Sequence, residues 1–282
     1  MPSCKPALPS VAPLFGGRAV PLIMGVVNVT SDSFFPGSRT PSKETSVARA
    51  LKMIEEGADI LDVGGQSTRP GSEPVSIDEE LARVLPVIEE IKSKTDVLLS
   101  VDTDKAIVAR AAREAGASIL NDVLALRSSR MMDEAVKFDA VIVMHMLGES
   151  PKTMQQAPRY RDVVREVRDF LEERVAAFAK AGGDAAKVLI DPGIGFGKEL
   201  EHNLSLLKHL GELAKLAPVV LGASRKSFLG KISPDSGPED RLPGSLAAAV
   251  WAAQRGVRVA RVHDVGATRK AFAFWASVSG AS

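Results

Sequence analysis

The chain has 282 residues, of which 45% are hydrophobic and 25% are charged. Its 36 Lys and Arg residues against 35 Asp and Glu residues leave a net charge of +1, so the charge favours neither a nucleic-acid nor an anionic-membrane partner. The single cysteine, Cys4, excludes an intrachain disulfide framework and a cysteine-based metal site. The Pro-rich start does not read as a signal peptide and no apolar run is long enough to span a membrane, so the sequence predicts a soluble, cytoplasmic protein.

After this start, short apolar runs alternate with longer amphipathic stretches, which predicts alternating strands and helices. Eight runs are expected to be strands, at residues 21–27, 60–63, 97–101, 118–120, 140–144, 188–190, 218–221 and 257–262. Helices are expected between them, among others at 42–56, 77–94, 104–115, 160–181 and 244–255. Four glycines stand where a left-handed residue would end a helix just before a strand: Gly57, Gly116, Gly182 and Gly256.

Eight strands with intervening helices predict an α/β fold, a single (β/α)8 TIM barrel over residues 19–279, preceded by a flexible N-terminal extension at 1–18. A doubly wound open sheet is the structural alternative. It does not need eight strands, and it usually carries a Gly-rich phosphate turn after its first strand, which this sequence lacks. Long loops are expected at 148–159 and 233–243, on the side of the barrel that carries active sites.

Nearly every apolar run is followed by a polar residue that a purely structural strand would not choose. These residues are Asn28, Asp62, Asp102, Asn121, His145, Asp191, Ser224 with Arg225, and Arg261 with His263. Any one of them is explained by a cap or a turn, but in a barrel all of them converge on one rim. Because side chains alternate along a strand, Arg261 and His263 should point together into the barrel mouth.

The residue types on this rim indicate what it binds. Ser67, Thr68 and Arg69 after the second strand, and Arg261 with His263 after the eighth, suit phosphate oxygens. Acceptors and an amide from Asp102, Asn121 and Asp191 suit a planar heterocycle with an amino-pyrimidinone edge. Because the sequence has no HExxH, nucleophile elbow or Walker motif, acyl transfer is disfavoured.

Eight sequence strings resemble, in order and spacing, those of the dihydropteroate synthases, the pterin-binding barrels of folate synthesis. They are MGVVNVTSDSF (24–34), DILDVGGQSTRPGS (59–72), SVDT (100–103), ILND (119–122), VMHM (143–146), LIDPGIGFGK (189–198), GASRKSFLG (222–230) and RVHDV (261–265). The resemblance runs from about residue 20 to 275. It departs from the usual pattern at Ser31, at the FFPGSR segment that follows, and at Gln66, where glutamate is frequent.

The resemblance implies a transferase that condenses 6-hydroxymethyl-7,8-dihydropterin diphosphate with p-aminobenzoate, giving 7,8-dihydropteroate and pyrophosphate, with Mg²⁺ as cofactor. It also implies a target of sulfonamides. It places the pterin diphosphate on Thr68, Arg69, Asp102, Asn121, Met144, Asp191, Lys226, Arg261 and His263, of which Asp102, Asp191, Lys226, Arg261 and His263 would be catalytic. It places p-aminobenzoate on Phe34, Thr68, Pro70, Phe196, Ser227 and Lys226, and an oxygen ligand for Mg²⁺ on Asn28.

Two other functions share this barrel. A pterin-binding methyltransferase acting on methyltetrahydrofolate has no use for a diphosphate site, so the two basic clusters argue against it. A non-catalytic pterin-binding protein would be indicated by loss of Lys226, Arg261 or His263, and all three are present.

Two histidines of one expected helix, His202 and His209, are interpreted as surface residues rather than metal ligands. The Ala-rich stretch SLAAAVWAA (245–253) allows close helix approach, and family members commonly dimerise through this end of the barrel, so a homodimer is expected.

Overall fold

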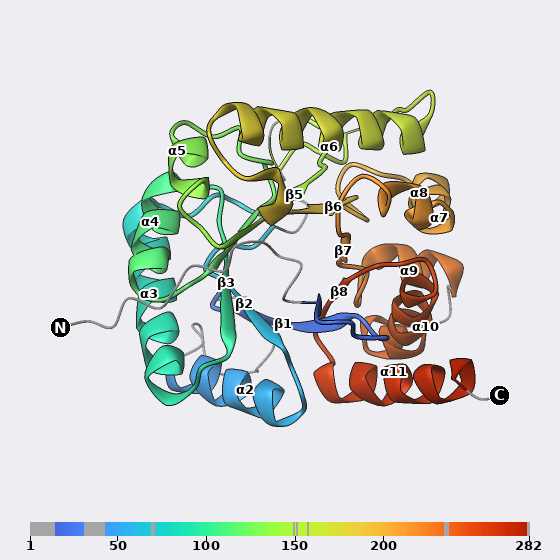
Figure 1. The fold of residues 1–282 in the computed structure, drawn as a ribbon, viewed down its shortest axis with the longest axis horizontal. Helices are drawn as coiled ribbons and strands as arrows, with labels where there is room; N and C mark the ends of the chain where they lie inside the picture. Colours follow the sequence, from blue (N-terminus) through green and yellow to red (C-terminus); the bar gives the residue numbers. More distant parts are fainter. Residues whose placement is uncertain are drawn as a thin grey trace.

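The computed structural model describes residues 15–30, 43–68, 71–148, 150, 152–156, 158–233 and 237–280. Its eight strands are β1 (Leu22–Asn28), β2 (Ile60–Gly64), β3 (Leu98–Asp102), β4 (Ile119–Asp122), β5 (Ala140–Met144), β6 (Val188–Asp191), β7 (Val220–Leu221) and β8 (Val259–Val262). All neighbouring strands are parallel, in the order β6-β5-β4-β3-β2-β1-β8-β7. A parallel bridge between Ile190 and Val219 joins β6 to the start of β7, so the sheet closes into a barrel (Figure 1).

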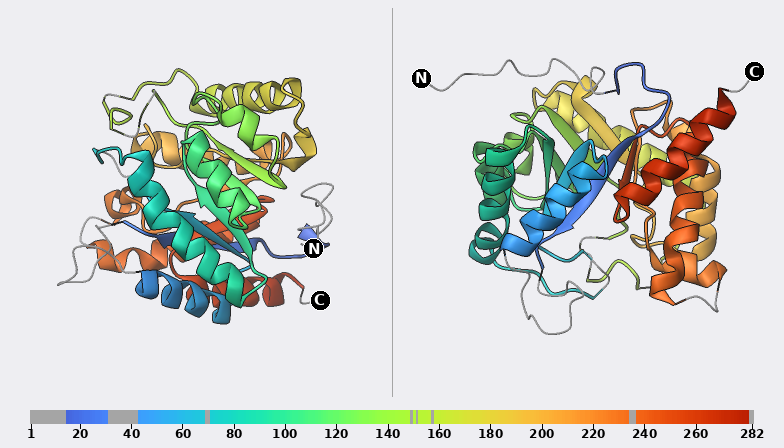
Figure 2. Two further views of the ribbon diagram at one scale, coloured as in Figure 1. Left: turned by 90° about the vertical axis from the view of Figure 1, so that its left-hand side faces the viewer. Right: turned by 90° about the horizontal axis from the view of Figure 1, so that it is seen from below.

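The helices surround the barrel in chain order (Figures 1 and 2). They are α2 (Lys43–Glu55), α3 (Ile77–Lys94), α4 (Ala106–Glu114), α5 (Met131–Ala135), α6 (Val163–Lys180), α7 (Leu200–Lys208), α8 (Leu210–Leu213), α9 (Ser227–Ile232), α10 (Leu242–Ala253) and α11 (Val265–Ser279), with short 3-10 turns at Ala185–Lys187 and Pro238–Arg241. This arrangement confirms the predicted TIM barrel. None of the described helices is both long and apolar enough to cross a membrane.

The predicted helix ends are largely confirmed. Gly57, Gly116, Gly182 and Gly256 all have a positive φ, between 81° and 114°, as a left-handed residue after a helix requires. The expected loop at 233–243 is wrong in its second half, because a 3-10 turn begins at Pro238 and α10 already begins at Leu242.

The core has two parts. A large apolar cluster lies between the sheet and the helices, and a smaller one fills the interior of the barrel at the amino-terminal ends of the strands. Phe15 belongs to the inner cluster, and the guanidinium of Arg258 lies 4.7 Å from the centre of its ring. Phe15 therefore contacts the barrel although the sequence predicts a flexible extension at 1–18, and residues 1–14 of that extension lie outside the described part of the chain.

Candidate active site

The inner face of the barrel changes from apolar to polar along the strands. Ile60 of β2 and Val259 of β8 belong to the apolar inner cluster. Two residues further along the same strands come Asp62 and Arg261, which face the same way because side chains alternate along a strand. The polar layer thus lies at the carboxyl ends of the strands, where active sites of TIM barrels are found.

Arg261 binds two carboxylates in this polar layer. Its Nε donates to Asp62 Oδ2 at 2.6 Å, and its Nη2 donates to Asp102 Oδ2, also at 2.6 Å. Asn121 Nδ2 donates to the same oxygen of Asp62 at 3.0 Å. Asp62 is fully buried, and Asp102 and Asn121 are buried with it. Four strands, β2, β3, β4 and β8, therefore contribute to one network.

Burial and neighbouring charges set the ionisation of this network. Burial raises the pKa of Asp102 to about 7 although Arg261 lowers it, and the charge of Asp62 contributes to the rise. Burial opposes the charge of Arg261, but Asp62 and Asp102 raise the pKa of the guanidinium above its ordinary value. At neutral pH Arg261 is therefore charged while Asp102 is close to its titration point.

Asp191 and Lys226 form a second charged group in the mouth. Asp191 is buried at the end of β6 and its Oδ1 accepts from the backbone N–H of Gly193 at 2.7 Å. Burial raises the pKa of Asp191, against the effect of Lys226. Burial in turn lowers the pKa of Lys226 to about 8, against the effect of Asp191. The Nζ of Lys226 lies 4.5 Å from the centre of the Phe196 ring, so an aromatic face lies next to Asp191 and Lys226.

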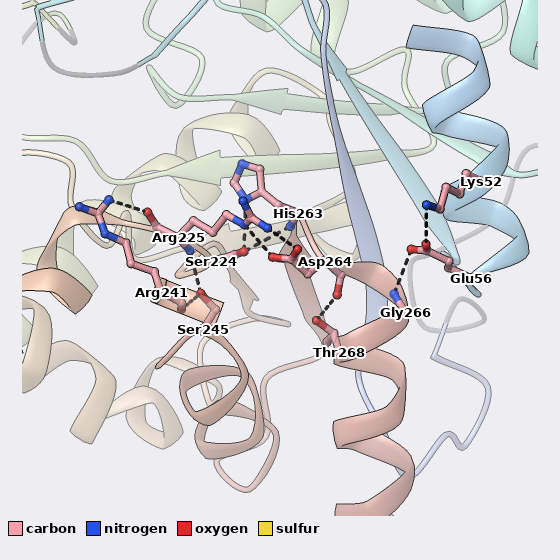
Figure 3. Close-up of polar contacts among 10 residues, drawn as sticks. All are labelled: Lys52, Glu56, Ser224, Arg225, Arg241, Ser245, His263, Asp264, Gly266 and Thr268. Atoms are coloured by element: carbon pink, nitrogen blue, oxygen red, sulfur yellow. Dashed lines mark hydrogen bonds and ion pairs between the residues drawn. The ribbon is translucent and has the colours of Figure 1, made fainter. Parts of the chain in front are cut away.

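Ser224 orients His263 (Figure 3). Its Oγ accepts from the backbone N–H of His263 at 3.2 Å and lies 3.1 Å from Nδ1 of the same residue. The hydroxyl hydrogen remains free to be donated to Nδ1, which leaves the ring proton on Nε2. Burial, with the charge of Arg261, lowers the pKa of His263 to about 3, so the imidazole is neutral and offers one N–H donor.

The loop that precedes Lys226 is held by polar side chains at the amino-terminal ends of α10 and α11 (Figure 3). Arg225 has φ 58°, an unusual conformation for a non-glycine residue. Its guanidinium makes a bidentate pair with Asp264 at 2.8 and 2.5 Å, and its carbonyl accepts from Arg241 at 3.1 Å. Its backbone N–H donates to Ser245 Oγ at 2.9 Å. These contacts fix the backbone from which Lys226 enters the mouth.

Comparison with known proteins agrees with this geometry. The model of the family described as pterin binding enzyme matches residues 24–263. The chain is 47% identical over 253 residues to the dihydropteroate synthase of Escherichia coli K12, with 89% of each chain covered. The chain belongs to the dihydropteroate synthases. It is therefore a transferase of folate biosynthesis, and the methyltransferase alternative is not supported.

Solved dihydropteroate synthases share the fold along nearly the whole chain. The enzyme of Xanthomonas albilineans with 4-aminobenzoic acid superposes with a TM-score of 0.87 at 47% identity, covering 93% of this chain and 94% of that one. The enzyme of Yersinia pestis in a sulfonamide drug complex superposes with a TM-score of 0.88 at 40% identity, covering 93% and 96%. Both matches show that the barrel described above is the dihydropteroate synthase fold.

The structure brings together most of the residues that the synthase motifs singled out. Met144 is buried in a cluster with Phe196 packed against it, and Ser227 is the exposed first residue of α9. Thr68 is partly exposed after β2. Phe34, Arg69 and Pro70 lie outside the described residues.

Asn28 is the residue that the sequence suggests as a ligand for a metal ion. Asn28 is half-buried at the end of β1. Within the described ranges no three His, Cys, Asp or Glu side chains are grouped to hold a metal. Mg²⁺ in phosphate sites usually takes one or two protein ligands and completes its shell with phosphate oxygens and water. A carboxamide oxygen from Asn28 therefore fits an ion that binds together with a diphosphate.

Sequence reasoning assigned no role to three polar residues that the structure ties to the site. The sequence shows Asp62, His145 and Ser224 only as polar residues at strand ends. In the structure each of them contacts a partner that is distant in sequence. Asp62 meets Arg261 across 199 residues. Such pairings depend on closure of the barrel, and the only local signal was a polar residue where a strand ends.

His202 and His209 do not share one helix as expected. His202 lies on α7, and His209 is the junction residue at which α7 ends and α8 follows. His202 Nδ1 accepts from the backbone N–H of Glu199 at 3.1 Å, and His209 Nδ1 lies 2.8 Å from the carbonyl oxygen of Ser205. Both imidazoles therefore cap local backbone groups.

Proposed function

We propose that the mouth of this barrel binds 6-hydroxymethyl-7,8-dihydropterin diphosphate and p-aminobenzoate side by side and condenses them. The bond between the exocyclic carbon and the diphosphate oxygen breaks, a bond from that carbon to the aniline nitrogen forms, and the nitrogen loses a proton. The observation that carries the proposal is the polar layer, in which three acidic or amide side chains, Asp102, Asn121 and Asp191, lie beside the cations Arg261 and Lys226.

The pterin ring is bound at the acidic end of the layer. The amino and N–H edge of the ring is a row of donors, and Asp191 and Asp102 offer the acceptors that a buried donor edge requires. Asn121, already held by Asp62, presents its carboxamide oxygen to the ring. Met144, which is buried beside Phe196, packs against the ring. The aniline nitrogen of the second substrate is neutral, so its attack needs no strong base.

The diphosphate is bound at the basic end. Two nitrogens of Arg261 are engaged by carboxylates and Nη1 remains to donate, His263 offers its Nε2 hydrogen, and Thr68 with Arg69 completes the donors. Asn28 would hold Mg²⁺, which when bound would help to neutralise the charge that develops on the departing pyrophosphate.

The second substrate is bound against the ring of Phe196. Lys226, whose ammonium lies over that ring, would attract the carboxylate of p-aminobenzoate, with Ser227, Thr68, Phe34 and Pro70 completing the pocket. The structure of the Xanthomonas albilineans enzyme with 4-aminobenzoic acid supports p-aminobenzoate as the second substrate.

One assay tests the proposed function. Pyrophosphate release is measured from the purified protein with the pterin diphosphate, Mg²⁺ and p-aminobenzoate, and then with each omitted in turn. We expect release only with all three. Release that does not depend on p-aminobenzoate would contradict the proposal.

The protein is proposed to be a cytoplasmic homodimer. Trp251 on α10, and Phe274 and Val278 on α11, are large apolar side chains that are 42%, 73% and 59% exposed. They occupy the two helices expected to face a second copy, and burial of such side chains is favourable. Sedimentation equilibrium of the purified protein gives the oligomeric state directly, and a monomer at all concentrations would contradict the dimer.

A further inference from the structure

The loop between β6 and α7, residues 192–199, lies at the mouth and is held by side chains from outside it. The backbone carbonyl of Ile194 accepts from Lys226 Nζ, that of Gly195 from Gln155 at 2.6 Å, and that of Gly197 from the Tyr160 hydroxyl at 2.9 Å. The loop also packs tightly on the end of β5. A Cβ at Gly193 would lie 1.9 Å from the carbonyl oxygen of His145, so no other residue fits there.

The carbonyl of Phe196, between those of Gly195 and Gly197, is held by a buried lysine. Lys198 is only 3% exposed, and its Nζ donates to the carbonyl of Phe196 at 3.0 Å. The same nitrogen lies 2.9 Å from Nδ1 of the buried His145 and 3.4 Å from the carbonyl oxygen of His145. The Lys198 amine thus connects the end of β5 to Phe196, and Lys226 Nζ lies over the ring of Phe196.

This amine is costly to bury. Burial, with the charge of Lys226, lowers the pKa of Lys198 well below its ordinary value, and burial with Lys198 lowers that of His145. An unbranched apolar side chain would fill the same space without that cost. What the amine adds is a directed bond to one carbonyl, and that carbonyl belongs to the aromatic residue of the mouth.

We propose that Lys198, supported by His145, is a positioning residue for the p-aminobenzoate subsite: it fixes the backbone of Phe196 so that the ring faces Lys226. The inference rests on the proposed function. It assigns Lys198 no contact with either substrate. It expects the effect of Lys198 to fall on the second substrate, because the amine bonds the carbonyl of Phe196, whereas Asp191 at the end of β6 is held by its own bond from the backbone N–H of Gly193.

The test is Lys198→Met, assayed by pyrophosphate release with each substrate varied. We expect the KM for p-aminobenzoate to rise about tenfold, since misplacement of a binding group by about 1 Å has effects of this order or larger. The KM for the pterin diphosphate should change by less than about twofold. Equal changes in both, or no change in either, would overturn the inference, while p-aminobenzoate-dependent turnover of the unaltered protein separately tests the proposed function.

Two further variants separate positioning from general loosening of the loop. If Lys198 acts through Phe196, Lys198→Met should add nothing to the rise in KM caused by Phe196→Ala, and additive effects would refute that route.

Tyr160→Phe is the matched control, because it removes the bond to the carbonyl of Gly197 and keeps the aromatic ring. An equal rise in KM in this control would show loosening alone. Should Lys198→Met not fold, as judged by circular dichroism, Lys198→Gln retains an amide donor on a shorter side chain. We then expect a smaller rise in KM that is still confined to p-aminobenzoate, and equal changes in both KM values would overturn the inference.

Discussion

Replacing Asp62 by asparagine removes one charge from the centre of the mouth and almost nothing else. The Asp62 Oδ2 accepts from both Arg261 and Asn121, whereas Oδ1 is buried without a hydrogen-bond partner in the described part of the chain. The amide oxygen of asparagine can take the place of Oδ2 and accept both bonds. The amide nitrogen then takes the place of Oδ1, where it is buried and unpaired.

The cost of Asp62→Asn follows from these two changes. Exchanging a charge-assisted bond with Arg261 for a neutral one loses about 1 kcal/mol or more. Burying an unpaired amide costs about 1–3 kcal/mol. We expect the free energy of unfolding to fall by about 2–4 kcal/mol, which lowers Tm by about 5 °C in a chain of this size. We expect kcat/KM for the pterin diphosphate to fall about tenfold or more, because Arg261 loses a charged partner.

The pH dependence of Asp62→Asn gives the sharper test. The charge of Asp62 helps to raise the pKa of Asp102, and Arg261 lowers it. Without that charge the pKa of Asp102 falls below about 7, so Asp102 ionises at lower pH and the rise of kcat/KM with pH moves in the acid direction. Glu134→Gln is the matched control, since Glu134 is a buried carboxylate paired with Arg110 away from the mouth. A shift toward alkaline pH, or equal kinetic effects in both variants, would refute the reasoning.

Three further outcomes are expected. Arg261→Ala should lower kcat/KM for the pterin diphosphate at least about tenfold, whereas Arg258→Ala, just before the same strand, should leave it unchanged; the assay is pyrophosphate release. Lys226→Arg should extend activity to higher pH, because the lysine, with a pKa of about 8, loses its charge above that pH and arginine does not; an unchanged alkaline limb of the pH profile would contradict this. Ser224→Ala removes the hydroxyl beside His263 Nδ1, so it should raise the KM for the pterin diphosphate but not for p-aminobenzoate. Nitrogen NMR should show that His263 no longer keeps the Nε2–H tautomer alone. A single unchanged tautomer would count against the role assigned to Ser224.

The strands were predictable because their signal is local. A strand covered by helices on one side and by the barrel interior on the other shows as a continuous apolar run, and all eight runs are strands. The bounds were less predictable, as in β7, which was expected at 218–221 and is found at Val220–Leu221. At its start, Pro218 has no N–H to donate, and Val219 makes only an isolated bridge to Ile190. Ladder geometry of this kind is set by the partner strand and is absent from the local pattern.

The site was predictable as a set of residues and not as a set of contacts. Alternation along β8 was enough to place Arg261 toward the mouth. The alternation gave no sign that Nε and Nη2 of Arg261 bind Asp62 and Asp102. These bonds leave Nη1 to donate to a diphosphate. The partner of His145 was equally hidden, because Lys198 is 53 residues away on a loop whose path depends on packing.

The charges of the mouth explain why a neutral heterocycle suits it. Three carboxyl groups, Asp62, Asp102 and Asp191, are buried there beside the cations Arg261 and Lys226. The pairing of charges is incomplete, and Asp102 and Asp191 both have a raised pKa as a result of their burial. A ligand edge that donates several N–H bonds satisfies carboxylate oxygens and stabilises their ionised form without a third buried cation. An exocyclic carbon that gains positive charge as pyrophosphate departs is stabilised by the same carboxylates, so one arrangement of charges serves both binding and bond breaking.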